Sequence, residues 1–325
     1  MENFAFAFNA LAPLIFLALL GYYLRQKQVL SDNFISHLNR FIFVVALPVL
    51  IFVTLANVEG LEKISWGVVW FSIVMTFVVV LAGTFAVLFW QGKKEHKPVV
   101  LQSLFRGNFV LIGIPLAMRL GGNDYLSVVL ILNVFLIPLV NALSIVVFHL
   151  FQKTERFTMR MFFGLLTDTF KNPLMIAVVL GILAIVFEAP WIALKENAGV
   201  FVETLDYIAV TATPMALIAV GGQFKITRSR ALMSPILFGS IGRLVAVPTV
   251  VFVSAVLLRP WITFDHSWAA LISIFASPVA VSSVAVTKGL GGDDELASQL
   301  VLWTTAAAVF TIFFIVVLFR YVGFL

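Results

Sequence analysis

The feature that most constrains this chain is a series of apolar runs, each about as long as a helix that crosses a bilayer. A transmembrane helix needs about 20 predominantly apolar residues. Ten segments qualify: 5–24, 34–56, 64–90, 99–119, 125–150, 162–187, 200–222, 232–258, 268–288 and 296–320. Hydrophobic residues make up 62% of the 325 residues and charged residues only 11%, whereas soluble domains hold about 25% charged residues. The sequence therefore predicts an all-α integral membrane protein with ten transmembrane helices.

Basic residues are divided unequally between the two sides of the predicted membrane. Twelve Lys and Arg residues fall on one side, chiefly in the loops 93–97, 153–160 and 225–230, and five fall on the other. Because cytoplasmic loops are enriched in Lys and Arg, we expect those loops in the cytoplasm and both termini outside the cell. The membrane would be the plasma membrane, which in a bacterium is the inner membrane. The net charge of +5 then reflects topology, and no nucleic-acid partner is expected.

Proline and glycine recur in the same order in the two halves of the chain. The matched positions are Pro13 and Gly21 with Pro173 and Gly181, Pro48 with Pro214, Pro115 with Pro278, and Gly121-Gly122 with Gly291-Gly292. Each half holds five predicted spans, and an odd number places the second copy upside down in the membrane. We therefore predict inverted repeats at 1–150 and 162–325, joined by a cytoplasmic linker at 151–161. Such repeats are typical of secondary transporters.

The fourth and ninth spans are predicted to be broken helices. The fourth contains Gly113-Ile114-Pro115, and the ninth contains Ser277-Pro278, which reads as an N-cap followed by a first-turn proline. Unwound backbone is tolerated in a membrane only around a protein-lined or water-filled cavity. Half-helices that begin near Pro115 and Pro278 would turn free N–H groups toward an anion there. The alternative is that both prolines only kink packed helices.

Polar side chains inside the spans complete the predicted site. Asn108, Asn133, Ser282 and Ser283 are read either as substrate contacts or as caps and interhelical hydrogen bonds. Arg243, near the middle of the eighth span, either holds the anion or forms a structural ion pair or backbone clamp. The predicted substrate-binding residues are Asn108, Gly113, Ile114, Pro115, Asn133, Arg243, Ser277, Pro278, Ser282 and Ser283.

Missing residue types narrow the chemistry. Predicted spans 3, 4, 5, 8, 9 and 10 contain no Asp or Glu, which argues against cation exchange and favours an anionic solute. The chain has no cysteine, and its four histidines show no metal-ligand spacing. No convincing catalytic triad or phosphate-binding loop is present. We therefore expect no enzyme activity, no metal and no cofactor.

Several segments resemble the auxin efflux carrier family, which includes plant auxin exporters and bacterial permeases for malonate, malate and related acids. These segments are Asn108 to Leu116, Leu38 to Phe41 before Pro48, Lys171 to Leu174, and Pro278 with Lys288 ten residues later. The resemblance covers essentially the whole chain. It implies a scaffold of spans 1, 2, 6 and 7, and a moving unit of spans 3–5 and 8–10. It also implies an elevator-like motion and a carboxylate held where the broken helices cross.

Two departures from the plant members stand out. The central loop has only about a dozen residues, as in a bacterial-type member, and the third span lacks the acid and base that support the site in some plant members. The sequence thus predicts a permease or efflux carrier for a small mono- or dicarboxylate. Its expected partners are that organic acid and the lipid bilayer, and a homodimer through the scaffold spans is left open. A sodium-coupled carrier of similar architecture and a membrane sensor without flux are the alternatives.

Overall fold

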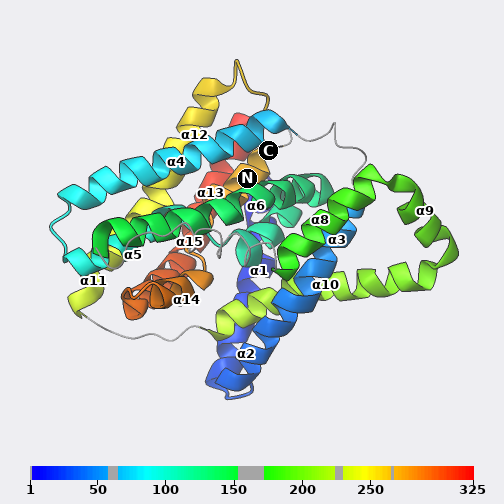
Figure 1. Ribbon diagram of the computed structural model, residues 1–325, viewed down its shortest axis with the longest axis horizontal. Coiled ribbons are helices and arrows are strands. Elements are labelled where there is room, and N and C mark those ends of the chain that lie inside the picture. Colours follow the sequence, from blue (N-terminus) through cyan, green and yellow to red (C-terminus); the bar gives the residue numbers. More distant parts are fainter. Residues whose placement is uncertain (1, 58–64, 153–171, 224–229, 265–266) are drawn as a thin grey trace.

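The computed structural model describes residues 2–57, 65–152, 172–223, 230–264 and 267–325, and these residues are helical apart from short connections (Figure 1). The helices are α1 (Glu2–Gln26), α2 (Asp32–Phe41), α3 (Leu47–Ala56), α4 (Trp66–Phe89), α5 (Lys97–Phe105), α6 (Ile114–Gln152), α8 (Pro173–Val186), α9 (Glu188–Asn197), α10 (Gly199–Gly222), α11 (Met233–Ile241), α12 (Val247–Leu258), α13 (Trp268–Phe275), α14 (Ser282–Gly289) and α15 (Asp294–Val322). Three π turns join some of them: η1 (Ile42–Ala46), η4 (Phe109–Gly113) and η6 (Gly242–Ala246).

Seven helices in the described part of the chain are long and apolar enough to cross a membrane, and a bent pair formed by α8 and α9 would make eight. The prediction of a multi-pass helical membrane protein is confirmed, whereas the count of ten stays a prediction. The count differs because the fourth and ninth predicted spans are divided into short helices. The first part of the sixth span, with the predicted linker at 151–161, lies mostly outside the described residues.

Each π turn ends two residues before a proline, namely Pro48, Pro115 or Pro248. A proline inside an α-helix has no N–H to donate and clashes with the carbonyl four residues earlier. A π turn bonds residues five apart instead, which widens the helix at the position where that carbonyl would meet the ring. The wider turn thus lets these three spans continue through their prolines.

Glycines set the closest helix contacts. A Cβ atom on Gly21 of α1 would lie 2.0 Å from the carbonyl oxygen of Ile218 in α10, and one on Gly221 of α10 would lie 1.8 Å from that of Ala18. The two helices therefore pack backbone against backbone. A Cβ atom on Gly181 of α8 would lie 2.7 Å from the Leu55 side chain of α3.

The two ends of the described chain lie at the same end of the molecule. The Arg320 guanidinium of α15 lies 4.7 Å from the centre of the Phe6 ring in α1, and the rings of Phe4 and Phe313 are 5.4 Å apart. Helices α1 and α15 are therefore antiparallel neighbours, as an even number of membrane crossings requires.

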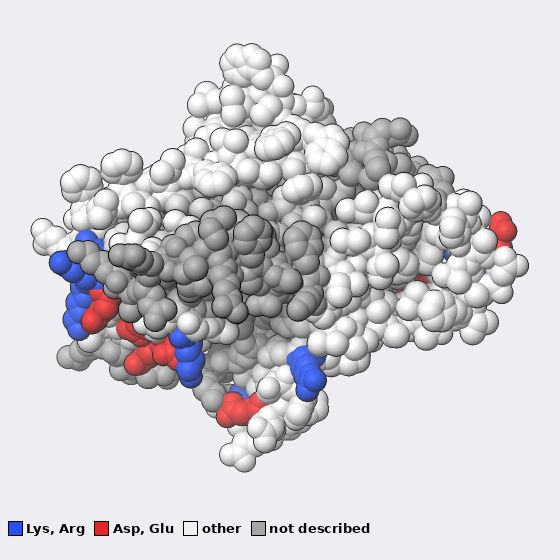
Figure 2. All heavy atoms as spheres, viewed as in Figure 1, with Lys and Arg blue, Asp and Glu red and all other residues white. Residues whose placement is uncertain are grey.

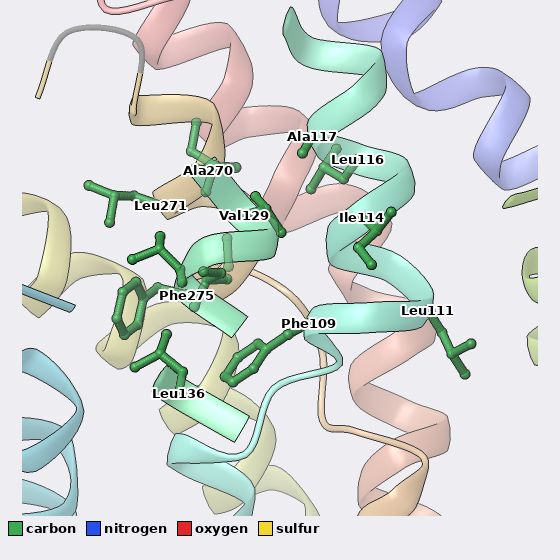
Figure 3. Close-up of a cluster of buried hydrophobic side chains, with 14 of the residues drawn as sticks. Phe109, Leu111, Ile114, Leu116, Ala117, Val129, Leu136, Ala270, Leu271 and Phe275 are labelled. Carbon is green, nitrogen blue, oxygen red and sulfur yellow. The ribbon is translucent and has the colours of Figure 1, made fainter. Parts of the chain in front are cut away.

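The surface matches a membrane environment. Uncharged atoms dominate the face shown in Figure 2, and charged residues gather along its lower left and bottom, in the region where Figure 1 places α2, α5 and α14. The lateral face of α4 exposes large apolar side chains, including Trp70 at 64% and Phe85 at 64%. Inside, Phe109 of η4, Leu136 of α6 and Phe275 of α13 belong to the central hydrophobic core (Figure 3).

Candidate functional site

Two unwound segments meet in the interior of the protein. Helix α5 ends at Phe105 and η4 begins at Phe109, while α13 ends at Phe275 and α14 begins at Ser282. The Asn108 N–H donates to the Pro278 carbonyl at 2.7 Å, and the Ala280 N–H donates to the Arg106 carbonyl at 3.0 Å. These bonds pair the two segments antiparallel around Gly107 and Val279. We call residues 106–108 and 276–281 the junction.

The helices restart at other residues than the sequence suggested. The second half of the fourth span begins at Phe109, six residues before Pro115, because the π turn η4 carries the helix through that proline. Gly113 and Ile114 are therefore helical, and a Cβ atom on Gly113 would lie 2.9 Å from the Ser273 carbonyl oxygen. Gly113 thus serves close packing of η4 on α13.

The prediction that a helix begins at Ser277-Pro278 is wrong, because α14 begins at Ser282. The Ser277 hydroxyl instead donates to the Ile274 carbonyl at 2.8 Å, at the end of α13. Pro278 lies in the unwound segment, where its carbonyl accepts the Asn108 N–H. The helix α14 starts four residues later, at Ser282, after an N-cap at Val281.

Arg243 of η6 is a backbone clamp. Its side chain is buried, and its Nε donates to the Ser277 carbonyl at 2.8 Å. Its Nη1 donates to the Leu104 carbonyl at 2.9 Å, and its Nη2 donates to the Ile274 carbonyl at 2.9 Å and to the Ser277 hydroxyl at 3.1 Å. The last carbonyls of an α-helix lack intrahelical partners. One guanidinium thus satisfies the carboxyl-terminal ends of α5 and α13 together.

Arg106 has a different environment. It is 6% exposed, and its Nη1 donates to the Asn141 side-chain oxygen at 2.7 Å and to the Ser144 hydroxyl at 3.4 Å. Its Nη2 lies 3.4 Å from the Ser282 hydroxyl, and its Nε has no hydrogen-bond partner. Among the described residues, neither Arg106 nor Arg243 forms an ion pair with a carboxylate.

The two arginines lie on opposite sides of the unwound segment after α5. A Cβ atom on Gly107 would lie 2.0 Å from the Arg243 Nη2 and 2.7 Å from the Ser277 Oγ, so this face of Gly107 is closed by the clamp. Successive residues of an extended segment point to opposite faces. Arg106 and Asn108 therefore share the other face.

Asn108 caps the helix that follows it. Its side-chain oxygen accepts the Leu111 N–H at 3.2 Å, and its side-chain nitrogen is buried without a partner. The side-chain amide of Asn133 in α6 and the Ser283 hydroxyl in α14 are also buried without partners. No hydrogen bond among the described residues joins either of these two side chains to the junction.

The sequence analysis did not include Arg106 in the site. The available signal was a basic residue inside an apolar span that contains no acid. That pattern is the same for Arg243, however, and only the contacts of the folded chain separate the two roles.

Comparison with known families gives a match over nearly the whole chain. A sequence model of one protein family, described as "membrane transport protein", matches residues 6–316. A search of curated proteins found no match to the chain. Members of this family are transporters and not enzymes. Because the match spans nearly the whole sequence, the chain belongs to this family of membrane transport proteins, the auxin efflux carrier family.

Proposed function

We propose that this chain is a ten-span secondary transporter that binds a small organic anion, a mono- or dicarboxylate, at the junction. The observation that carries the proposal is the pair of unused donors on one face of residues 106–108, the Nε of Arg106 and the side-chain nitrogen of Asn108. A buried donor left without a partner costs about 1–3 kcal/mol. A carboxylate bound there would accept from both groups and would neutralise Arg106.

Helix ends add to the positive potential at the junction. The helical segment that starts at Phe109 and the helix α14, which starts at Ser282, both begin there. The first N–H groups of a helix lack intrahelical partners and carry about half a positive charge at the helix end. Since Arg243 is committed to backbone carbonyls, Arg106 is the cation that we assign to the substrate.

The packing supports two inverted repeats. Helix α1 of predicted span 1 packs against α10 of span 7, and α3 of span 2 packs against α8 of span 6. In the predicted repeats span 1 corresponds to span 6 and span 2 to span 7, so the repeat symmetry exchanges one packed pair for the other. The two matched glycines have the same role in these pairs, since Gly21 packs against α10 and Gly181 packs against α3. The agreement between sequence offset and helix contact supports a duplicated architecture.

An elevator-type motion fits the contacts around the junction. An apolar cavity of about 400 Å³ lies between α1 and α10, which we assign to the scaffold, and η4, α6 and α15, which we assign to the moving unit. The cavity wall includes Ile112, which lies one turn after Asn108. It also includes Thr305, and the hydroxyl of the preceding residue, Thr304, accepts the Val279 N–H of the junction. Such an apolar boundary favours sliding of the two groups, and the Arg119 hydrogen bond to the Asn9 carbonyl of α1 is a polar contact that the motion would have to break.

The proposal is tested by binding measurements on purified protein with a panel of mono- and dicarboxylates, with and without sodium and at several pH values. Arg106→Gln and Asn108→Ala should each weaken binding of the best ligand by about 10- to 100-fold, since a hydrogen bond to a charged group contributes about 1.5–3 kcal/mol. Arg119→Gln is the control, because Arg119 is exposed and its side chain makes one hydrogen bond within the described part of the chain, to the Asn9 carbonyl. Unchanged affinity in both junction variants would refute the site.

The same panel separates the alternatives. Binding that requires sodium would identify a sodium-coupled carrier, and binding without flux in proteoliposomes would favour a sensor. We place the protein in the plasma membrane, the inner membrane of a bacterium, with both termini outside. A homodimer through the scaffold helices is the further partner that we propose.

A further inference from the structure

We infer that the outer face of α14 lines a water-filled route along which anions reach the junction, and that this conformation is open to the side where α14 ends. The inference rests on the proposed function, because the route leads to the site proposed there. We call Ser282, Ala285, Lys288 and Gly289 the α14 face; all four residues are exposed.

The composition of the α14 face differs from that of a lipid-facing surface. Most exposed residues in the middle of α4 and α15 are large and apolar, as Leu81 at 61%, Phe310 at 68% and Phe314 at 63% illustrate. Such side chains are favourable in hydrocarbon. The α14 face instead presents a hydroxyl, a methyl group, an amine and a bare glycine, and a Cβ atom on Gly289 would meet nothing within 4 Å.

A buried cation lies at the inner end of the α14 face. The Arg106 Nη2 lies 3.4 Å from the hydroxyl of Ser282, and Ser282 is exposed although Arg106 is only 6% exposed. The Nε of the same guanidinium has no partner. A solute that moves along the face therefore meets a positive charge with an unused donor at the point where the face reaches the junction.

The contacts at the other end of α14 give the route its direction. Asp293 lies shortly after the end of α14, and His96 lies directly before α5. The Asp293 carboxylate is 3.3 Å from the His96 Nε2. The outer end of α14 and the start of α5 therefore lie on the same side, together with the basic loop 93–97. We assign this side to the cytoplasm, so the conformation is open inward.

The mouth of the route carries charges of both signs. The Lys288 Nζ lies 3.8 Å from the Asp294 carboxylate, and the Lys93 Nζ lies 3.5 Å from that of Glu95. Glu295 adds a further acid in the first turn of α15. The mouth is therefore a weak filter, and discrimination between anions and cations is expected at Arg106.

Single cysteines test the route without knowledge of the substrate, because the chain contains none. We would place Ala285→Cys on the α14 face, Gln91→Cys in the exposed basic-side loop, and Leu81→Cys on the lateral surface of α4. Membrane vesicles of each orientation are treated with an anionic or a cationic methanethiosulfonate. The ratio of the two rates at each site is divided by the ratio at Gln91→Cys, which removes the intrinsic difference between the reagents.

The route predicts that Ala285→Cys reacts with both reagents from the basic side and that Leu81→Cys reacts with neither. The anionic reagent should be favoured by about tenfold at Ala285→Cys, since charged clefts concentrate ions of opposite sign by at least this factor. Adding Arg106→Gln should remove that preference while the rates at Gln91→Cys stay the same. Gly289→Cys, placed in open space, repeats the measurement at a second position.

Two results would overturn the route. If Ala285→Cys and Gly289→Cys are as inert as Leu81→Cys, the α14 face contacts lipid. If both react without an anionic preference, or with a preference that survives Arg106→Gln, the face is hydrated but does not guide anions to Arg106. Neither result decides the proposed function, because the binding assay with Arg106→Gln and Asn108→Ala tests the junction separately.

Discussion

Replacing Arg243 by glutamine should destabilise the protein strongly, because this side chain satisfies three buried carbonyls, two at the ends of α5 and α13 and one in the junction. The guanidinium forms four hydrogen bonds, three of them to the carbonyls of Leu104, Ile274 and Ser277. A glutamine amide can restore about one of these contacts. Each buried carbonyl left without a donor costs about 1–3 kcal/mol.

The loss is partly offset, because the variant no longer buries a charge. We therefore expect the free energy of unfolding to fall by about 3 kcal/mol, which corresponds to a shift of about a hundredfold in the unfolding equilibrium. The measurement is reversible unfolding in mixed micelles of detergent and denaturing detergent, followed by circular dichroism. Arg119→Gln removes one exposed contact and should change the free energy by no more than about 0.5 kcal/mol. An Arg243→Gln protein within about 1 kcal/mol of the wild type would refute the clamp.

Three further predictions follow from the same structure. Gly21→Ala should lower the free energy of unfolding by about 2–3 kcal/mol, because its Cβ atom would meet the Ile218 carbonyl. The control is Gly199→Ala, whose Cβ atom would meet nothing within 4 Å and which should be neutral. Equal thermal midpoints for the two variants would contradict the backbone contact of α1 and α10. Pro115→Ala restores an N–H that can close an ordinary α turn in place of the π turn η4. Since η4 directly follows Asn108, the variant should impair anion binding more than expression. A variant with full affinity would show that η4 does not position Asn108. A single cysteine between residues 153 and 160 should resist a membrane-impermeant thiol reagent in intact cells, and its labelling from outside would invert the proposed topology.

The sequence correctly predicts a multi-pass helical membrane protein because hydrophobicity is a local property. Seven of the ten predicted spans overlap the long apolar helices among the described residues, and the predicted break between the spans 99–119 and 125–150 coincides with a kink in α6, where Gly122 has a φ of 70°. A positive φ is a conformation that glycine adopts without strain. The double glycine thus marks the break between these two predicted spans at the position where α6 is kinked.

The roles of the two buried arginines depend on long-range contacts that the sequence cannot rank. Arg243 reaches Leu104 across 139 positions and Ile274 across 31, and Arg106 reaches Asn141 across 35. Each arginine lies in an apolar span without an acid, so sequence alone leaves substrate contact and structural clamp equally open for Arg243. The position of the helix restart was wrong for a local reason, because the π turn η4 accommodates Pro115 within a helix.

The π turns before Pro48, Pro115 and Pro248 also bear on which length changes the chain can tolerate. Removing one residue from an ordinary α-helix rotates everything beyond it by about 100°, because a turn holds 3.6 residues. A π turn contains one residue more than an α turn. Losing a residue within 42–46, or a residue other than Arg243 within 242–246, would leave an α turn and keep both flanking helical faces aligned with their neighbours, provided that the following proline is also replaced, because an α turn would bring its ring against the carbonyl four residues earlier. With Pro48 or Pro248 replaced and Arg243 kept, these two short segments are therefore the positions at which a single-residue deletion should least disturb the packing of the helices.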